Sequence, residues 1–449
     1  MTNILKFWAS FVVVLFFVSC GSDTGDDTPA VDAPILVSST PEAGATKVKR
    51  GAITIELKYD KNIFFASKDL NRIAFTGGEL LSADVLGASS TLTVKVNVPT
   101  RETTCTLSIP EGVIVGANQT PVSAVSLQFS TAALDKKLVN ASATAATQKV
   151  YAYLLENYES KTFSAMMANV NWNTEKAEQV YQWTGKHPAI NCFDYIHLYA
   201  SGENWINYSD ITPVKNWWDA GGLVAAMWHW NVPTADPASA SEKNYAFYKA
   251  DTSFDADKAL AEGTWENKVF TEDLAKIVDC LKLLQDEDIP VIWRPFHEAA
   301  GGWFWWGKNA ASLKAMWIAM FDYFKAQGLN NLIWVWTTET GDEDWYPGDA
   351  YVDIIGRDLY GNSSSSCASQ YASIVDAYGN KMVALSECGY SEYTTSVVGK
   401  ISEQWAAGAR WLWFMPWYDN AGAASFHADQ SWWQDAMNQD FVITREDLP

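Results

Sequence analysis

The sequence predicts an α/β protein in which a (β/α)8 TIM barrel follows a small all-β sandwich. Residues 33–131 consist of short alternating strands without Trp, whereas the later part of the chain alternates apolar runs with helical stretches. A chain of 449 residues, 48% of them hydrophobic, can fill both cores. Of the 23 Trp, all but Trp8 lie at or beyond Trp172, so the enrichment in Trp belongs to the predicted barrel.

Residues 1–20 are predicted to be a lipoprotein signal peptide. Lys6 precedes the apolar run "FWASFVVVLFFVSC", which is short for a membrane span and ends in a small residue before Cys20. This pattern resembles a bacterial lipoprotein signal, in which the chain is cleaved before Cys20 and lipidated there. A plain signal peptide or an anchor helix has the same general form and is the alternative.

The polar segment 21–32 is expected to be a flexible tether, because it is acidic and poor in core-forming residues. Acidic residues directly after Cys20 resemble the surface-export signal of Bacteroidetes lipoproteins. We therefore expect an outer-membrane lipoprotein anchored through Cys20 at the cell surface, with the periplasmic face as the alternative.

Residues 33–131 are predicted to form the sandwich. In "AITIELKY" the apolar residues Ile53, Ile55, Leu57 and Tyr59 alternate with polar ones, as in a half-buried strand. The segment resembles bacterial immunoglobulin-like domains that act as spacers. Residues 132–147, rich in Ala and Thr, are predicted to be a linker into the barrel domain.

Residues 148–449 are predicted to be the barrel. The apolar runs are "SAMMANV", "FDYIHLY", "GLVAAMWHW", "PVIWRPFHE", "NLIWVWTT", "VDIIGRDLY", "MVALSECG" and "RWLWFMPW". Stretches such as "TEDLAKIVDCLKLLQDED" between them have helical spacing, and eight strand–helix pairs make a (β/α)8 barrel. The run "SSSS" at 363–366 is expected to be a loop. A doubly wound sheet is the alternative, but the sequence has no Gly-rich phosphate turn after the first run.

The composition argues against nucleic acid as a partner. The formal net charge is −21, and the sequence has no long basic run to neutralise phosphates. The five cysteines after Cys20 have no paired spacing, and the five His form no HxH or HExxH pattern. We therefore expect no metal site and no cofactor.

In a barrel, the active site lies at the carboxyl ends of the strands. Glu298 ends the fourth run and Glu387 the seventh, so the two carboxylates are expected to face each other across the mouth. The other polar and aromatic residues at these ends are His229, His297, Asp358, Tyr360, Trp413, Trp417 and Tyr418.

Two carboxylates beside Trp side chains suit the hydrolysis of a glycosidic bond. One must stay protonated to give a proton to the leaving oxygen, and the other must be ionised to attack the anomeric carbon. Aromatic burial and a neighbouring like charge raise the pKa of the first, whereas Arg and Tyr contacts stabilise the second as an anion. Trp covers the apolar faces of sugar rings, and no metal is required.

The motifs "RPFHE" and "GGWFWWG", with "WHW" upstream and "YPGDAYVDIIGRDLYG" and "ALSECG" downstream, resemble glycoside hydrolase family 26. The resemblance covers residues 147–441. It implies a retaining endo-β-1,4-mannanase with Glu298 as the acid/base and Glu387 as the nucleophile. The implied partner is a β-mannan-type polysaccharide: mannan, glucomannan or galactomannan.

The resemblance also implies five substrate-binding residues. His297 would line the site beside the acid, and His229 would contact sugars further along the cleft. Trp303 would pack against the catalytic centre, and Tyr360 would orient the nucleophile through a hydrogen bond. Trp417 would form the floor of the −1 subsite.

The chain departs from the family pattern after the acid. Ala299–Ala300 and Gly301–Gly302 stand where Met-Asn and Gly-Asp are common, and "NVNWN" replaces a Gln-rich end of the first strand. These changes leave the subsite preference open. Mixed-linkage β-glucan or β-1,3-xylan is therefore the alternative substrate for the same mechanism.

Two other interpretations remain. Glu298 is, alternatively, a structural ion-pair partner of Arg294, and Glu339 at the end of the fifth run is a competing carboxylate. The alternative from another functional class is a non-catalytic surface glycan-binding lipoprotein with a Trp-lined cleft.

Overall fold

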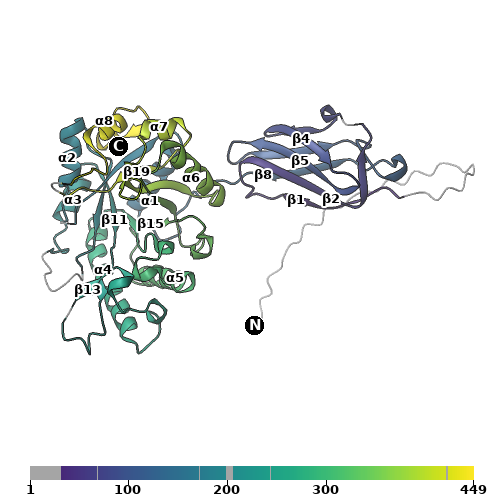
Figure 1. Ribbon diagram of the computed structural model, residues 1–449. Helices are drawn as coiled ribbons and strands as arrows, with labels where there is room; N and C mark the ends of the chain where they lie inside the picture. The colour runs from purple at the N-terminus through teal and green to yellow at the C-terminus, as the bar shows by residue number, and fades with distance from the viewer. Residues whose placement is uncertain (1–31, 68, 171, 199–205, 243, 421–422) are drawn as a thin grey trace, which may run out of the picture.

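The computed structural model describes residues 32–449 except 68, 171, 199–205, 243 and 421–422, and it shows two domains side by side (Figure 1). The signal peptide, Cys20 and all but the last residue of the expected tether lie outside the described residues. Within the described ranges, none of the helices combines the length and the hydropathy needed to span a bilayer.

The N-terminal domain is a sandwich of two antiparallel sheets, as predicted. One sheet has the order β1 (Leu36–Thr40), β2 (Gly51–Phe65), β5 (Ser89–Val98) and β4 (Glu79–Val85), with β7 (Ile114–Val115) paired to β2. The other has the order β3 (Ala74–Thr76), β6 (Thr104–Ile109) and β8 (Val125–Ser130). The alternation in the sequence is confirmed, since Ile55 and Leu57 of β2 are fully buried between the sheets.

The C-terminal domain is a closed barrel of eight parallel strands. In chain order these are β9 (Thr162–Met167), β10 (Ile190–Asp194), β11 (Leu223–Met227), β14 (Val291–Arg294), β15 (Leu332–Thr337), β16 (Ile354–Tyr360), β17 (Met382–Ser391) and β19 (Trp413–Pro416). Each pairs in parallel with the next, and β19 pairs with β9 to close the ring. The short β20 (Val442–Ile443) pairs in parallel with Thr162 and Phe163, the first two residues of β9.

The barrel is covered by helices, with one gap in the predicted alternation. They are α1 (Ala145–Asn157), α2 (Glu175–Thr184), α3 (Thr212–Asp219), α4 (Trp265–Asp286), α5 (Ala310–Ala326), α6 (Ser364–Ala377), α7 (Ile401–Ala406) and α8 (Gln430–Met437). Between β15 and β16 the structure has only the 3-10 turn η7 (Glu343–Trp345), so the prediction of a helix after every strand is wrong there.

Two local expectations also differ from the structure. The second strand spans Ile190–Asp194 rather than 193–199, because the apolar residues before Asp194 are the ones that fill the barrel. The segment 363–366 is not a loop: the Ser363 hydroxyl accepts the Ser366 amide at 3.2 Å and begins α6.

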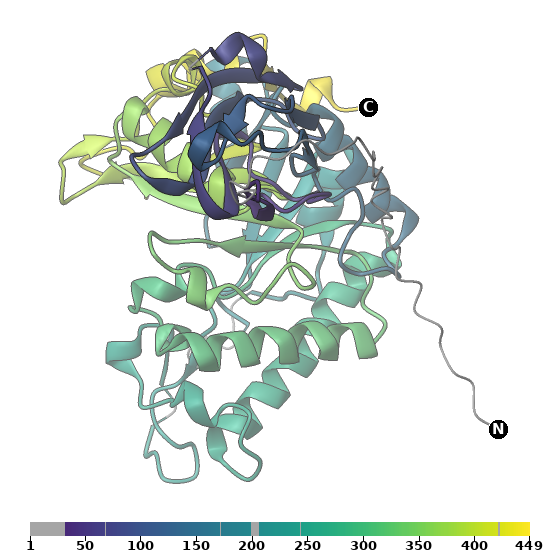
Figure 2. The same ribbon diagram turned by 90° about the vertical axis from the view of Figure 1, so that its right-hand side faces the viewer.

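The sandwich contacts the barrel on the face opposite its mouth. Glu159 precedes β9 and Asp376 precedes β17, so both lie at the amino ends of barrel strands. Glu159 accepts hydrogen bonds from Arg50 and Arg101 of the sandwich at 3.0 and 3.2 Å, and Lys49 pairs with Asp376 at 2.9 Å. Figure 2 shows the sandwich in front of the C-terminal part of the barrel, leaving α4 and α5 uncovered.

The segment expected to be a linker packs against the barrel. Leu138 and Ala143 are buried in the barrel core, the Val139 amide donates to Asp353 at 2.7 Å, and α1 begins at Ala145. The segment between the two domains is therefore fixed against the barrel by buried side chains and a hydrogen bond.

Glu159→Gln tests this contact, because the change leaves two partly buried guanidinium groups without their counter-charge. Although burial opposes it, Arg50 and Arg101 lower the pKa of Glu159 below 4.5. We expect a loss of about 1–2 kcal/mol in the free energy of unfolding at pH 7, measured by thermal unfolding.

The pH dependence has a definite sign. A carboxylate with a lowered pKa stabilises the fold above its unfolded pKa and loses that effect as the pH falls through its folded pKa. The difference between wild type and Glu159→Gln should therefore shrink below pH 4.5. The exposed Glu156 provides the control: Glu156→Gln should leave the unfolding curve unchanged, and an equal loss in both variants would contradict the ion-pair account.

Candidate active site

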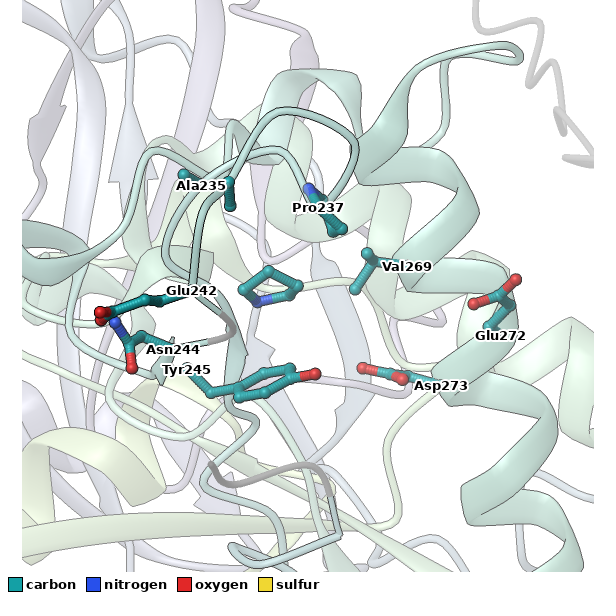
Figure 3. A pocket seen from close by; sticks show the side chains of 10 residues that line it. Ala235, Pro237, Glu242, Asn244, Tyr245, Val269, Glu272 and Asp273 are labelled. Carbon is teal, nitrogen blue, oxygen red and sulfur yellow. The ribbon is translucent and has the colours of Figure 1, made fainter. Parts of the chain in front are cut away.

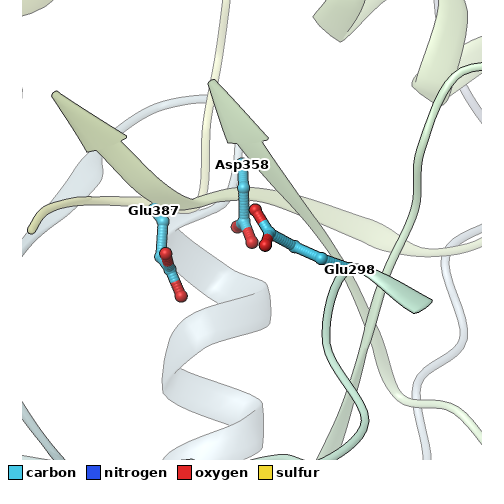
Figure 4. Close-up of side chains that lie close together, drawn as sticks. All are labelled: Glu298, Asp358 and Glu387. Carbon is cyan, nitrogen blue, oxygen red and sulfur yellow. The ribbon is translucent and has the colours of Figure 1, made fainter. Parts of the chain in front are cut away.

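Three acidic side chains converge at the carboxyl ends of the barrel strands (Figure 4). Glu387 lies in β17, Asp358 in the neighbouring β16, and Glu298 in the loop after β14. One oxygen atom of each lies within 4.8 Å of an oxygen of the other two. The structure thus brings together the two glutamates that the sequence placed across the mouth, and it adds an aspartate.

The Glu387 carboxylate receives a donor on each oxygen. Arg294 Nη2 forms a buried ion pair with Oε1, and the Tyr360 hydroxyl donates to Oε2 at 2.7 Å. Burial and the nearby carboxylates raise the pKa of Tyr360 well above its usual value, so its hydroxyl keeps its proton. Because donors on both oxygens stabilise negative charge, Glu387 is held as an anion. The hydrogen bond implied between Tyr360 and Glu387 is present.

Arg294 does not pair with Glu298, which was the structural alternative. Its Nη1 donates to Asp358 Oδ2 and to Thr337 Oγ1, both at 3.0 Å, while Nη2 faces Glu387. Ser386 Oγ donates to the other oxygen of Asp358 at 2.7 Å. One guanidinium therefore holds two buried carboxylates, neither of which is Glu298.

Glu298 has the opposite environment. Its carboxyl group is mostly enclosed and, among the described residues, receives the Trp303 indole N–H at 3.1 Å. Burial, followed by the charges of Asp358 and Glu339, raises the pKa of Glu298 well above its usual value. A carboxyl group with a raised pKa is better suited to donate a proton than an ordinary one.

The loop that carries Glu298 is fixed by indole N–H groups. Phe296 and Glu298 both have positive φ, at 49° and 51°, a backbone region that side-chain-bearing residues rarely adopt. Trp306 Nε1 donates to the His297 carbonyl at 2.9 Å, and Trp305 Nε1 donates to the Trp230 carbonyl at 2.6 Å. These contacts compensate for the strained turn and aim Glu298 at the other two carboxylates.

The two histidines lie deeper than the sequence suggested. His297 is only 1% exposed, and its Nε2 lies 3.1 Å from Nε2 of His229. His229 is 8% exposed, and its Nδ1 lies 2.6 Å from the Asp194 carboxylate. His297 is therefore part of a buried chain behind the acid rather than an exposed wall of the cleft.

The Trp side chains divide as predicted. Trp303 is 43% exposed and Trp417, just after β19, is half-buried, with its ring 5.7 Å from that of His229. The packing indoles Trp305, Trp306, Trp334 and Trp336 are each at most 2% exposed. Of these indoles, Trp303 and Trp417 are therefore the ones that stay partly exposed.

Sequence reasoning missed four residues of this region: Arg294 as the partner of Glu387, Asp358 as a third carboxylate, Asp194 behind His229, and His427. His427 Nδ1 accepts the Tyr390 amide at 3.1 Å, and its ring packs on Tyr360 at 5.7 Å. Of the four, Asp358 could have been recognised from the sequence, because it stands near the end of an apolar run. The roles of the other three depend on contacts between segments that are distant in the sequence.

Glu339, the competing carboxylate at the end of the fifth run, is paired with another residue and does not belong to the three converging carboxylates. It forms an ion pair with Arg357 at 2.9 Å, and burial raises its pKa to about 7. It influences the charge of Glu298 but lies beside η7, outside the trio of carboxylates.

A separate pocket lies under the segment 233–245 and against α4 (Figure 3). Tyr245 and Asp273 point into it, and none of the three converging carboxylates lines it. Asp273 Oδ2 accepts the Trp230 indole N–H at 2.7 Å, and burial raises the pKa of Asp273 to about 8. Asp273 thus holds the buried Trp230 indole, and this pocket is not the candidate active site.

The trio of Glu298, Asp358 and Glu387 is also close enough to share a metal ion. However, Arg294 already donates to two of its members, and its fixed positive charge would repel a cation at that point. The arrangement favours acid–base and nucleophilic chemistry by the carboxylates themselves.

Comparison with known proteins agrees with this geometry. The family model for glycosyl hydrolase family 26 matches residues 139–447. The chain belongs to glycosyl hydrolase family 26. A model for a bacterial Ig-like domain matches residues 30–131.

Family 26 relatives match the barrel. The corresponding domain of an endo-beta-mannanase/endo-beta-glucanase from Prevotella bryantii is 43% identical, with a TM-score of 0.65, over 70% of this chain and 99% of that one. A beta-mannanase from a symbiotic protist of the termite Reticulitermes speratus, complexed with gluco-manno-oligosaccharide, is 35% identical, with a TM-score of 0.62, over 71% and 98%. Mannan endo-1,4-beta-mannosidase B of Piromyces sp is 32% identical over 71% of this chain and 55% of its own length. The chain spans about half the length of such curated relatives.

The two glycines before Trp303 have separate backbone reasons. Gly301 agrees with the family pattern, and the Trp303 ring folds back over it, where an added Cβ would lie 2.1 Å from a ring carbon. Gly302, which departs from the pattern, has a φ of 76°, a conformation that favours glycine. Glycine at both positions lets the indole reach Glu298.

Arg294→Gln should destabilise the protein, because two buried carboxylates would lose their counter-charge. We expect a loss of about 3–5 kcal/mol at pH 8. The loss should be smaller at pH 5, since without Arg294 the pKa values of these carboxyls rise and they take up protons in the folded state. Thermal unfolding at both pH values measures this. Arg294→Lys keeps the positive charge but cannot donate to both carboxylates in the same way, so its stability should lie between those of wild type and Arg294→Gln. An equal loss of stability in Arg294→Gln at pH 8 and pH 5 would contradict the explanation.

Proposed function

We propose that the chain is a retaining endo-β-1,4-mannanase that cleaves internal linkages of mannan, glucomannan or galactomannan. The observation that carries the proposal is the contrast between two neighbouring carboxyl groups: Glu298 is enclosed beside two other carboxylates and receives the Trp303 indole N–H, whereas Glu387 receives Arg294 and the Tyr360 hydroxyl on its two oxygens. The names of the family 26 relatives, several of them mannan endo-1,4-beta-mannosidases, indicate the substrate class.

The proposed reaction has two steps. Glu387 attacks the anomeric carbon while Glu298 protonates the leaving oxygen, which gives a glycosyl ester on Glu387. Glu298, now ionised, takes a proton from water as the water attacks the same carbon, and Glu387 is released. Carboxyl oxygens within 4.8 Å suit this retaining chemistry, because inverting enzymes keep their carboxyl groups about 6.5–9.5 Å apart.

The proposed binding surface follows from exposure. Trp417 would form the floor under the sugar at the cleavage point, and Trp303 would cover the leaving-group side next to the acid. His229 would touch the sugar only through the small exposed carbon edge of its ring, because both ring nitrogens face protein groups. His297, being buried, would act on the reaction only through its neighbours. The partly exposed indole faces suit the apolar faces of sugar rings.

We also propose that the protein is anchored to the outer membrane by a lipid on Cys20, at the cell surface. The signal pattern of residues 1–20 supports this proposal. The first described residues lie toward the end of the sandwich remote from the barrel, because β1 pairs antiparallel with the later half of β2 and β2 starts beside Glu159.

Glu387→Ala should reduce kcat by a factor of about 10⁴ or more while substrate binding persists, because it removes the nucleophile and leaves the indoles in place. The measurement is reducing-end release by a soluble form lacking residues 1–20, run on mannan, glucomannan, galactomannan, lichenan and β-1,3-xylan. Lichenan belongs in the panel because one relative is named an endo-beta-mannanase/endo-beta-glucanase. If wild type binds mannan, releases nothing from any polymer and matches Glu387→Ala in affinity, the protein is a binder instead.

The basic limb of the pH profile of kcat/KM should report the acid Glu298. Asp358→Asn removes a negative charge that raises the pKa of Glu298, so the limb should move down by roughly one pH unit or more. Trp303→Phe removes a hydrogen bond that lowers the same pKa, so the limb should move up. Glu392→Gln, at an exposed position, is the control and should leave the profile in place; shifts of the same sign in both site variants would rule out this assignment.

A further inference from the structure

The Asp194 carboxylate is buried at the end of β10 and uses both oxygens on one residue. Oδ1 accepts the backbone N–H of His229 at 3.1 Å, and Oδ2 faces His229 Nδ1 at 2.6 Å. The Asp194 side chain is 0% exposed. Because carboxylate oxygens are acceptors, the proton in the second contact lies on His229 Nδ1.

The proton position propagates to the next histidine. Nε2 of His229 and Nε2 of His297 lie 3.1 Å apart, so one of them carries the shared proton and the other is bare. His297 Nδ1 has no hydrogen-bond partner among the described residues, and a proton there would be buried and unpaired, so His297 carries its proton on Nε2. The chain therefore runs from His297 Nε2–H to His229 Nε2, and from His229 Nδ1–H to Asp194.

The surroundings of His297 agree with this direction. Burial, and then the proximity of His229 and Arg294, lower the pKa of His297 well below 6.5, so its ring is neutral. Its Nδ1 has no hydrogen-bond partner among the described residues. A bare Nδ1 leaves only an acceptor unused, whereas the reversed chain would bury an unpaired N–H at that atom, which proteins avoid.

We propose that Asp194 is a positioning residue that sets the tautomers of both histidines and thereby fixes the backbone that presents Glu298. His297 directly precedes Glu298, between two residues with positive φ, and its carbonyl is already held by Trp306. The hydrogen bond from the His297 ring to His229 is thus a second contact that can fix the backbone of this turn. The link to the reaction rests on the proposed function, whereas the tautomer assignment does not.

Asp194→Asn is a sharp test because an amide has one acceptor oxygen. The His229 backbone N–H is an obligatory donor, so the Asn oxygen must face it and the NH2 group must face Nδ1. His229 would then carry its proton on Nε2, and His297 would carry its proton on Nδ1, where no partner is described. An Asp-to-Asn change beside the catalytic His of serine proteases likewise leaves geometry intact and gives the wrong tautomer.

The first measurement is ¹⁵N NMR of histidine-labelled protein, which distinguishes bare from protonated ring nitrogens. His229→Gln and His297→Gln assign the signals. Wild type should show His229 protonated at Nδ1 and His297 at Nε2, and Asp194→Asn should reverse both. Opposite tautomers in wild type, or unchanged tautomers in the variant, would overturn the proposal.

The second measurement is kinetic. In Asp194→Asn, kcat should fall about 10- to 100-fold, as expected for a small displacement of the acid, with KM changed less than about threefold. Asp273→Asn is the matched control, since it is another buried aspartate that accepts a ring N–H but lies under Trp230, away from the histidine chain. It should keep both tautomers and activity. Reversed tautomers with kcat within twofold of wild type would disprove the positioning role.

A second variant covers the case in which Asp194→Asn does not fold. In His229→Gln, which keeps the Asp194 carboxylate, the amide NH2 group faces Asp194 and the amide oxygen accepts from His297 Nε2–H, so the His297 tautomer should stay as in wild type. A reversal there would contradict the chain. If wild type has the expected tautomers yet hydrolyses no β-glycan, the proposed function fails while the tautomer assignment stands.

Discussion

The contact of one guanidinium with two buried carboxylates organises the mouth of the barrel. Arg294 takes up the charges of Glu387 and Asp358, whereas Glu298 receives the neutral indole donor of Trp303. In a site of low exposure, a third negative charge close to Asp358 is unfavourable, which raises the pKa of Glu298. The difference between the environments of the two glutamates therefore follows from where a single arginine points.

The abundance of Trp has its reason in the same region. An indole fills a large volume and carries one N–H donor, so it can pack and hold a carbonyl at the same time. Trp305 and Trp306 do this for Trp230 and His297, and Trp303 does it for Glu298 itself. These contacts fix the left-handed turn at Phe296 and Glu298, which would otherwise relax. Support of Glu298 and its loop accounts for why one exposed indole, Trp303, stands so close to the buried Trp305 and Trp306.

The sequence predicted the barrel and both glutamates because each strand end carries its own signal, a polar residue after an apolar run. It did not predict the partner of Arg294, because the contact with Glu387 joins positions 93 residues apart, whereas Glu298 is the nearer residue in sequence. His297 was expected in the cleft because it adjoins the acid, but the turn at Glu298 directs the two side chains differently. Asp194 fell inside a predicted strand that the structure ends at that residue, so its role behind His229 was hidden.

The sandwich and the three carboxylates lie at opposite ends of the barrel. Arg50 and Arg101 hold the amino-end face of the barrel, while the three carboxylates open at the carboxyl ends of the strands. The start of β1 lies toward the far end of the sandwich, away from the mouth. On the proposed function, the partner is a long polysaccharide, whose internal linkage can reach the carboxylates only if both sides of the mouth are free. The sandwich meets that condition, because it packs on the amino-end face of the barrel and does not stand in front of the three carboxylates.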